Sequence, residues 1–292
     1  MIKLIICICG PTAVGKTKLS IELAKKYQAE IINYDSVQIY KGMDIASAKV
    51  TEEEKEGIIH HLIDIKEYKD NYSVYDYQID ARNKIKELQE KGKNIIFVGG
   101  TGLYLKATLF DYKFQSDEEV PDINLDNKEL LYAINVMNPD SKVDPNNRRR
   151  LIREYINLKS GVDNKQGNNL IYDNVYFIGL ETDRDILYDR INKRVDIMIE
   201  NGLLDEAKKF YNKKNRTKSI MTPIGYKELF KYFDKEISYE EAIDLIKKNS
   251  RHYAKRQFTF FKNQFNIKWF NTNYEDFNKT IDSVIEYIEG EI

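Results

Sequence analysis

Short apolar runs alternate with amphipathic stretches over the first hundred residues of the chain. The runs at 4–9, 31–32 and 95–98 contain no charged residue, which is typical of strands that are buried on both faces of a sheet. Apolar residues recur at helical spacing over 19–27 and again over 74–91. This alternation predicts an α/β fold with a parallel sheet that helices cover on both faces.

The pattern changes near residue 113. Residues 115–129 are acidic, helical patterns follow at about 128–137 and 147–158, and 160–169 is rich in Gly, Asn and Gln. We therefore expect a core interrupted by a small helical insertion domain. The three expected segments are the first part of the core over 1–112, the insertion over 113–170, and the second part of the core over 171–292.

The last segment is predicted to be mostly helical. It begins with a buried strand at 175–180 and contains another short strand at 267–270. Helical patterns occupy most of the remainder, over 185–201, 203–213, 226–233, 239–261 and 275–289.

Composition narrows the class of protein. The 292 residues include 46 Lys and Arg against 47 Asp and Glu, a net charge of −1, with 42% apolar and 32% charged residues. These values exclude a disordered chain, and no run approaches the ~20 apolar residues of a membrane helix. The first apolar run is too short for a secretory signal. We expect a cytoplasmic protein in which Cys7 and Cys9 are buried and reduced.

The pattern Gly10-x-x-x-x-Gly15-Lys16-Thr17 lies between a predicted strand and a predicted helix. Its glycines let the backbone turn so that successive amides and the helix N-terminus point at one anion. Lys16 adds a positive charge, and the Thr17 hydroxyl is a candidate Mg²⁺ ligand. The strand and helix on either side disfavour an ordinary glycine-rich turn. We predict a P-loop core of the nucleoside-triphosphate-hydrolase type, with a di- or triphosphate bound by Gly10, Thr12, Ala13, Val14, Gly15, Lys16 and Thr17.

Two further polar residues follow predicted strands. Asp35 comes after the second strand, whereas the third strand ends in Gly99-Gly100-Thr101-Gly102 without a carboxylate. Because the carboxyl ends of parallel strands face one crevice, we expect Asp35 and Thr101 to lie toward the phosphate loop. Asp35 is then a general base or a magnesium partner, with a turn or helix cap as the structural alternative. The residues alone indicate a phosphate-dependent transferase.

The order of several motifs resembles the tRNA dimethylallyltransferase (isopentenyltransferase) family over nearly the whole chain. Besides the phosphate loop, the matching stretches start at Asp35, His60, Val98, Arg150, Arg190, Ile224 and Tyr253. The resemblance implies transfer of a dimethylallyl group from dimethylallyl diphosphate to the N6 amine of the adenine 3′-adjacent to a tRNA anticodon, with release of diphosphate. It implies Mg²⁺ as the cofactor, and we expect a monomer.

The resemblance also implies roles for individual residues. Asp35 matches the base, Thr101 a residue that holds the reacting groups, and Lys16 a group that stabilises the leaving diphosphate. Arg194 is a candidate diphosphate clamp, although it could instead lie on a solvated helix face paired with Asp189 or Glu200. Two segments match the tRNA contacts: Asp35, Ser36, Val37 and Gln38, and Arg149, Arg150, Leu151, Ile152 and Arg153.

Three other functions remain compatible with these patterns. A small-molecule P-loop kinase would use the loop to bind ATP, and an adenylate isopentenyltransferase would act on a free nucleotide. An RNA-binding protein with a vestigial loop would show no turnover. The insertion, with its arginines at 148–150 and 153, favours a macromolecular acceptor. The intact set of Lys16, Thr17 and Asp35 favours catalysis.

Overall fold

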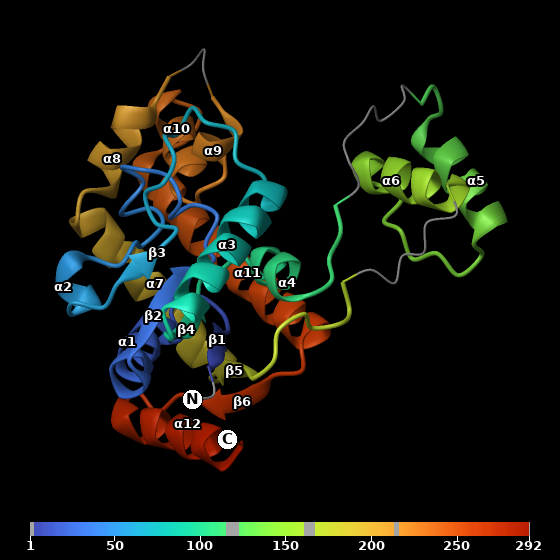
Figure 1. Ribbon diagram of the computed structural model, residues 1–292. Helices are drawn as coiled ribbons and strands as arrows, with labels where there is room; N and C mark the ends of the chain where they lie inside the picture. Colours follow the sequence, from blue (N-terminus) through green and yellow to red (C-terminus); the bar gives the residue numbers. More distant parts are fainter. Residues whose placement is uncertain (1–2, 115–122, 161–166, 213–215, 292) are drawn as a thin grey trace. The chain divides into compact units, whose positions relative to one another are not determined.

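Six parallel strands form one sheet in the computed structural model, which describes residues 3–114, 123–160, 167–212 and 216–291 (Figure 1). The strand order is β3-β2-β4-β1-β5-β6. The strands are β1 (Ile5–Cys9), β2 (Ala29–Asn33), β3 (His60–His61), β4 (Asn94–Val98), β5 (Val175–Glu181) and β6 (Lys268–Asn271). The predicted parallel sheet is confirmed.

Strand β1 is central, and all five of its residues are buried. Cys7 pairs with Phe97 of β4 on one side and with Phe177 of β5 on the other. Both cysteines are free and buried, as expected. Burial raises the pKa of the Cys9 thiol to about 12, so this thiol stays neutral and unreactive.

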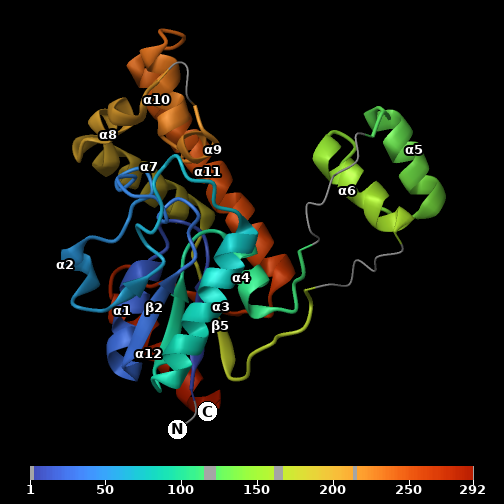
Figure 2. The same ribbon diagram turned by 45° about the horizontal axis from the view of Figure 1, so that its top comes forward.

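Helices lie on both sides of the sheet. Helix α1 (Lys16–Tyr27) packs its buried residues with Ile6 and Ile8 of β1 and with residues of α7 (Arg184–Glu200) and α12 (Phe277–Glu291). Helix α3 (Val74–Glu90) contacts β2 and β4, and Figures 1 and 2 place these strands between α1 and α3. Because side chains alternate along a strand, the central strands contribute to both cores.

The second half of the chain adds a helical layer with its own core. The helices of this layer are α7, α8 (Leu203–Phe210), α9 (Lys218–Met221), α10 (Tyr226–Phe233) and α11 (Tyr239–Gln264). Their residues pack with Tyr40 and Met43 of the segment after β2. The remaining helices outside the insertion are α2 (Glu52–Lys55) and α4 (Gly102–Leu109).

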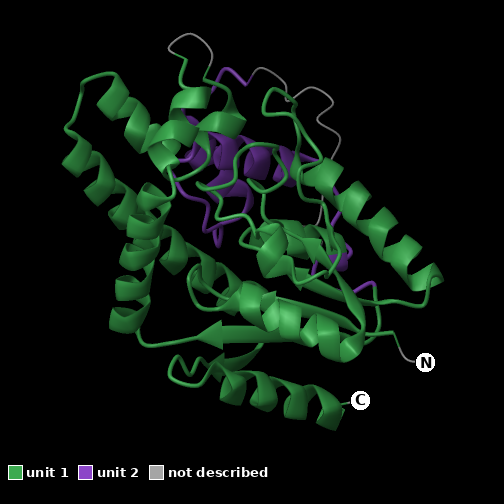
Figure 3. Cartoon of the chain, turned by 90° about the vertical axis from the view of Figure 1, so that its left-hand side faces the viewer, with its two compact units in different colours: residues 1–108, 172–292 green, residues 109–171 purple. Residues whose placement is uncertain are grey.

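Residues 109–171 form a second compact unit, distinct from the unit of 1–108 and 172–292 (Figure 3). It contains α5 (Asn127–Met137) and α6 (Arg148–Lys159). Leu130 and Ile134 of α5 and Leu151 of α6 are fully buried against each other. This small core holds the two helices together.

Most predicted elements are present, with ends shifted by a few residues. Strand β3 and helices α2, α4 and α9 are not among the predicted elements. Three of these contain only two to four residues, too few for a periodic pattern, and α4 is apolar on most sides because it is packed in the core. Parts of the acidic stretch (115–122) and of the Gly/Asn/Gln-rich stretch (161–166) lie outside the described residues.

One buried carboxylate holds the segment that follows the Asp35 motif. Glu206 of α8 is 5% exposed and accepts the backbone N–H groups of Asp44, Ile45 and Ala46 at 2.7–2.9 Å. The Tyr226 hydroxyl donates to the same carboxylate at 2.7 Å. Four donors on one side chain fix the path of this segment.

Replacement of Glu206 by Ala removes the acceptor from four donors. We expect the free energy of unfolding to fall by about 2–4 kcal/mol, because buried donors without partners are costly. Urea unfolding measures the change. Asp205→Ala, at the exposed neighbouring position, is the control and should change the free energy of unfolding by less than about 1 kcal/mol. Equal effects of the two changes would contradict this interpretation.

Candidate active site

The phosphate loop connects β1 to α1 through backbone conformations that favour glycine. Gly10 has φ +134° and Gly15 has φ +107°. A Cβ on Gly10 would lie 2.5 Å from the backbone oxygen of Leu180 in β5, so a side chain cannot be accommodated without movement. Ala13 has φ 67°. The close approach to β5 and the turn at Gly15 place the start of α1 at the carboxyl edge of the sheet.

Lys16 lies inside the curve of the loop. Its Nζ donates to the backbone oxygens of Gly10 at 3.0 Å and Pro11 at 2.7 Å. Burial lowers the pKa of Lys16 to about 7, with the positive charge of Arg194 acting in the same direction and Asp35 opposing it. An anion bound here would stabilise the charged form of Lys16.

Two arginines of α7 bind the same loop. Arg194 donates through Nη1 to the Thr12 hydroxyl at 2.9 Å, and Arg190 donates through Nε to the Ala13 oxygen at 3.0 Å. Arg194 therefore points to the loop, and Asp189, one of its two alternative partners, pairs with Lys193 at 2.8 Å. Burial lowers the pKa of Arg194, which still carries a positive charge beside the loop.

Asp35 lies two residues beyond the end of β2 and is partly buried. Its Oδ1 accepts the Val37 N–H at 2.9 Å. Burial raises the pKa of Asp35 above its ordinary value, opposed by the Val37 and Gln38 amides and by the charges of Lys16 and Arg194. The structure thus places this carboxylate in the electrostatic surroundings of the phosphate loop, as expected for a residue that follows a parallel strand. A raised pKa makes the carboxylate a stronger base.

Thr101 follows β4 and contacts the Asp35 segment. Its hydroxyl oxygen accepts the Ser36 N–H and donates to the Ser36 hydroxyl, both at 3.0 Å. The Thr101 N–H donates to the Tyr34 oxygen at 3.1 Å. These bonds confirm that Asp35 and Thr101 lie at one edge of the sheet.

Two residues of α11 that are not among the predicted site residues also reach this edge. Tyr253 and Gln257 both donate to the Gly100 oxygen, at 3.2 and 3.0 Å. A Cβ on Gly100 would lie 2.7 Å from Asp35 Oδ2 and 2.8 Å from Gln257 Nε2. Their four-residue spacing places Tyr253 and Gln257 on one face of a helix, and this spacing was the available sign in the sequence that the two side chains act together.

The remaining residues of the Asp35 segment are held by their own contacts. Gln38 donates through Nε2 to the backbone oxygens of Ser47 and Ala48 at 3.2 and 3.3 Å. Val37 packs against the helical core that contains Tyr40. The segment is therefore a shaped loop that continues into the region held by Glu206.

The predicted arginine segment lies on α6 of the second unit. Arg149, Arg150 and Arg153 are exposed, while Leu151 is fully buried and Ile152 packs against the same core. Arg148 donates to the backbone oxygens of Leu125 and Ile123, so it stabilises this unit. The three exposed arginines are available to an external anion, whereas Leu151 presents no side chain at the surface.

The candidate Mg²⁺ ligand at this edge is a single hydroxyl. Among the described residues, no group of three or more His, Cys, Asp or Glu side chains is placed to hold a metal ion. Thr17, which is exposed at the start of α1, offers one hydroxyl beside the anion loop. This donor set fits Mg²⁺, which is often bound by one or two protein oxygens together with substrate phosphates and water.

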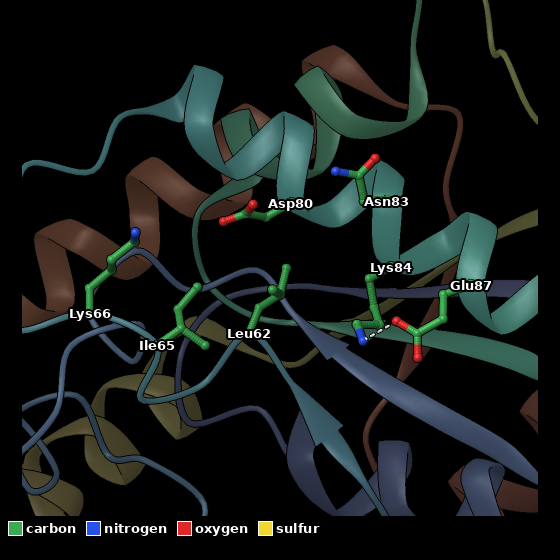
Figure 4. Close-up of a pocket in the computed structure, with 7 residues that line it drawn as sticks. All are labelled: Leu62, Ile65, Lys66, Asp80, Asn83, Lys84 and Glu87. Carbon is green, nitrogen blue, oxygen red and sulfur yellow. Dashed lines mark hydrogen bonds and ion pairs between the residues drawn. The ribbon is translucent and has the colours of Figure 1, made fainter.

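A separate hollow lies between the β3 segment and α3 (Figure 4). Its volume is about 390 Å³, and it is lined by Leu62, Ile65, Lys66, Asp80, Asn83, Lys84 and Glu87. None of these residues belongs to the phosphate loop or to the Asp35 segment.

None of the described helices is both long and apolar enough to cross a membrane.

Fold and site together define a P-loop α/β protein in which a carboxylate and an anion loop share one edge of the sheet. A family model described as IPP transferase matches residues 38–264. The tRNA dimethylallyltransferase of Anoxybacillus flavithermus is 44% identical over 301 residues, covering 98% of this chain and 96% of that protein. The corresponding Bacillus anthracis protein is also 44% identical, covering 98% and 95%. The chain belongs to the IPP transferase family and is a transferase.

Solved structures agree with this assignment. The tRNA isopentenylpyrophosphate transferase of Bacillus halodurans is 42% identical with a TM-score of 0.76, covering 99% of this chain and 96% of that one. A eukaryotic dimethylallyltransferase acting on tRNA is 28% identical with a TM-score of 0.84, covering 99% and 79%. The predicted P-loop fold is thus confirmed.

The position of Arg194 predicts a role in binding diphosphate. We expect Arg194→Gln to weaken binding of inorganic pyrophosphate about 10- to 100-fold, because a hydrogen bond from a charged donor contributes about 1.5–3 kcal/mol. Titration calorimetry with Mg²⁺ present measures the affinity. Lys193→Gln removes a neighbouring charge that is paired with Asp189 and should leave affinity within about twofold. Unchanged affinity in Arg194→Gln would exclude Arg194 from the anion site.

Proposed function

We propose that this chain transfers the dimethylallyl group of dimethylallyl diphosphate to the N6 amine of the adenine 3′-adjacent to the anticodon of tRNAs, releasing diphosphate. The observation that carries the proposal is the shared edge of the sheet, where the Asp35 carboxylate lies beside Gly100 and feels the charge of Lys16 in the phosphate loop. Near-complete matches to proteins named tRNA dimethylallyltransferase support it.

The donor side of the reaction requires stabilisation of a leaving diphosphate. As the bond between the allylic carbon and oxygen breaks, its electron pair passes to the diphosphate. The loop amides, Lys16 and Arg194 surround the place where this negative charge grows. Groups fixed before the reaction stabilise such charge more effectively than water, which must reorient.

The acceptor side requires removal of a proton. The adenine amine is a weak nucleophile, because its lone pair is delocalised into the ring. As nitrogen bonds to the allylic carbon, the N6 proton passes to the Asp35 carboxylate. A positioned base contributes typically 10²–10⁴-fold to such a step, and the raised pKa of Asp35 favours this role.

The tRNA is bound through two regions. The adenine leaves the stack of the anticodon loop, where bases unstack at lower cost than in a duplex, and meets the segment from Asp35 to Gln38. Arg149, Arg150 and Arg153, which are exposed on α6, contact phosphates of the anticodon stem. An acceptor of this size explains why the enzyme would carry a separate helical unit.

Mg²⁺ completes the donor site in this proposal. Thr17 would hold it together with diphosphate oxygens, and the ion would supply positive charge to the leaving group. We further propose that the enzyme acts as a monomer in the cytoplasm. These two statements follow from the family resemblance, and the phosphate loop and the Asp35 segment both lie within the larger unit of one chain.

Mass spectrometry of nucleosides tests the reaction directly. The protein is incubated with dimethylallyl diphosphate, Mg²⁺ and bulk tRNA, and we expect adenosine carrying a five-carbon unit together with released diphosphate. Parallel reactions replace tRNA by AMP, or the donor by ATP. Modification of AMP alone would indicate the adenylate enzyme, and phosphate transfer from ATP would indicate a kinase. Failure to modify any tRNA would exclude the proposed reaction.

The role of Asp35 is tested by Asp35→Asn, which keeps the shape of the side chain but removes the base. We expect kcat to fall at least about 100-fold, since a general base contributes typically 10²–10⁴-fold. Binding of pyrophosphate should remain close to wild type. Turnover within a few-fold of wild type would show that another group accepts the proton.

A further inference from the structure

Gln257 makes a bridge between the two loops of the active site. It lies on α11 and is 5% exposed. Its Oε1 accepts the N–H of Thr12 in the phosphate loop at 2.8 Å, and its Nε2 donates to the oxygen of Gly100 at 3.0 Å. The bridge joins two backbone groups from different loops through one rigid amide.

The chemistry of the amide explains why Gln occupies this position. A primary amide carries an acceptor and a donor on one carbon, so it pairs with an N–H and a C=O at the same time. A carboxylate can satisfy only the N–H, and an apolar side chain satisfies neither. Both partners are backbone groups that meet the buried Gln257 side chain. Without it, each group would lose a hydrogen bond that water cannot readily replace, which is costly.

Further hydrogen bonds connect each partner of Gln257 to residues assigned to the reaction. On the donor side, the Thr12 hydroxyl accepts from Arg194 at 2.9 Å. On the acceptor side, Gly100 precedes Thr101, whose hydroxyl oxygen accepts the Ser36 N–H at 3.0 Å next to Asp35. Gln257 thus links the phosphate loop to the loop that contacts the Asp35 segment.

We propose that Gln257 is a positioning residue that sets the separation of the phosphate loop and the Asp35 segment. The inference rests on the proposed function and names a residue that governs turnover rather than binding. Gln257 itself contacts neither substrate. It acts through Thr12 and Gly100, and misplacement of reacting groups by about 1 Å can reduce a rate about 100-fold.

Gln257→Met tests the proposal, because it keeps the length and burial of the side chain but removes both hydrogen bonds. We expect kcat for tRNA modification to fall roughly 10- to 100-fold. The KM values for dimethylallyl diphosphate and tRNA should stay within about threefold. Gln264→Met is the matched control on the same helix. Gln264 is exposed and accepts from Lys106 away from this edge, so its replacement should leave kcat within about twofold.

Gln257→Glu provides a second, independent readout through pH. A neutral carboxyl group can accept from Thr12 and donate to Gly100, whereas an ionised carboxylate cannot donate. We expect the ratio of mutant to wild-type kcat to be highest at low pH and to fall as pH rises. Dividing by the wild-type value removes the titration of groups common to both proteins. The charged or titratable groups facing this region are Lys16, Asp35, Tyr104, Arg194 and Tyr253.

The outcomes separate this inference from the proposed function. Absence of turnover in the wild-type protein would overturn the proposed function, and the inference with it. An active wild type with unchanged kcat in Gln257→Met would overturn the inference alone. The inference would also be overturned if the fall in kcat equalled the fall in the folded fraction of Gln257→Met at the assay temperature, as measured by thermal unfolding. If Gln257→Met does not fold, a pH-independent kcat ratio for Gln257→Glu would overturn it.

Discussion

The close approach of backbone and side chains around Gly100 is the constraint on which the site depends. An added Cβ there would collide with the Asp35 carboxylate and the Gln257 amide. Gly99 is equally confined, because its Cβ would lie 2.5 Å from the backbone carbon of Tyr34. Only a chain without side chains at these two positions can pass here. The loop after β4 can therefore lie against the loop after β2, which brings Thr101 to Ser36.

The same arrangement places positively and negatively charged side chains at one edge of the sheet. Lys16 and Arg194 belong to the side that receives an anion, and Asp35 belongs to the side that receives a proton. Each influences the pKa of the others: burial and mutual repulsion lower the pKa of Lys16, while burial raises that of Asp35. The raised pKa makes Asp35 a stronger base, and an anion bound to the phosphate loop would stabilise the charged form of Lys16.

Residues distant in sequence hold this edge together. Arg190 and Arg194 of α7 bind the phosphate loop, and Gln257 of α11 joins it to the loop after β4. Glu206 of α8 fixes the segment that continues from the Asp35 motif. The helical second half of the larger unit thus positions loops that the sheet alone would leave free to move.

The sequence by itself determined the local features of this protein. Apolar runs identified the central strands, because burial on both faces leaves no polar alternation, and the glycine and lysine spacing identified the phosphate loop. The parallel order of strands also predicted that Asp35 and Thr101 share an edge. Two-residue strands such as β3 could not be predicted, because they are stabilised by pairing with β2 and not by their own pattern.

Only the tertiary structure decided which polar residues act together. The sequence allowed Arg194 to pair with Asp189, yet the fold gives Asp189 to Lys193 and directs Arg194 to Thr12. The family resemblance includes Leu151 in a segment that matches tRNA contacts, and the fold places its side chain in the core of the second unit. Gln257 had no assigned role until α11 was placed against the loops. Such hydrogen bonds depend on the distances between segments that lie far apart in the chain. The local pattern of apolar and polar residues contains no information about those distances.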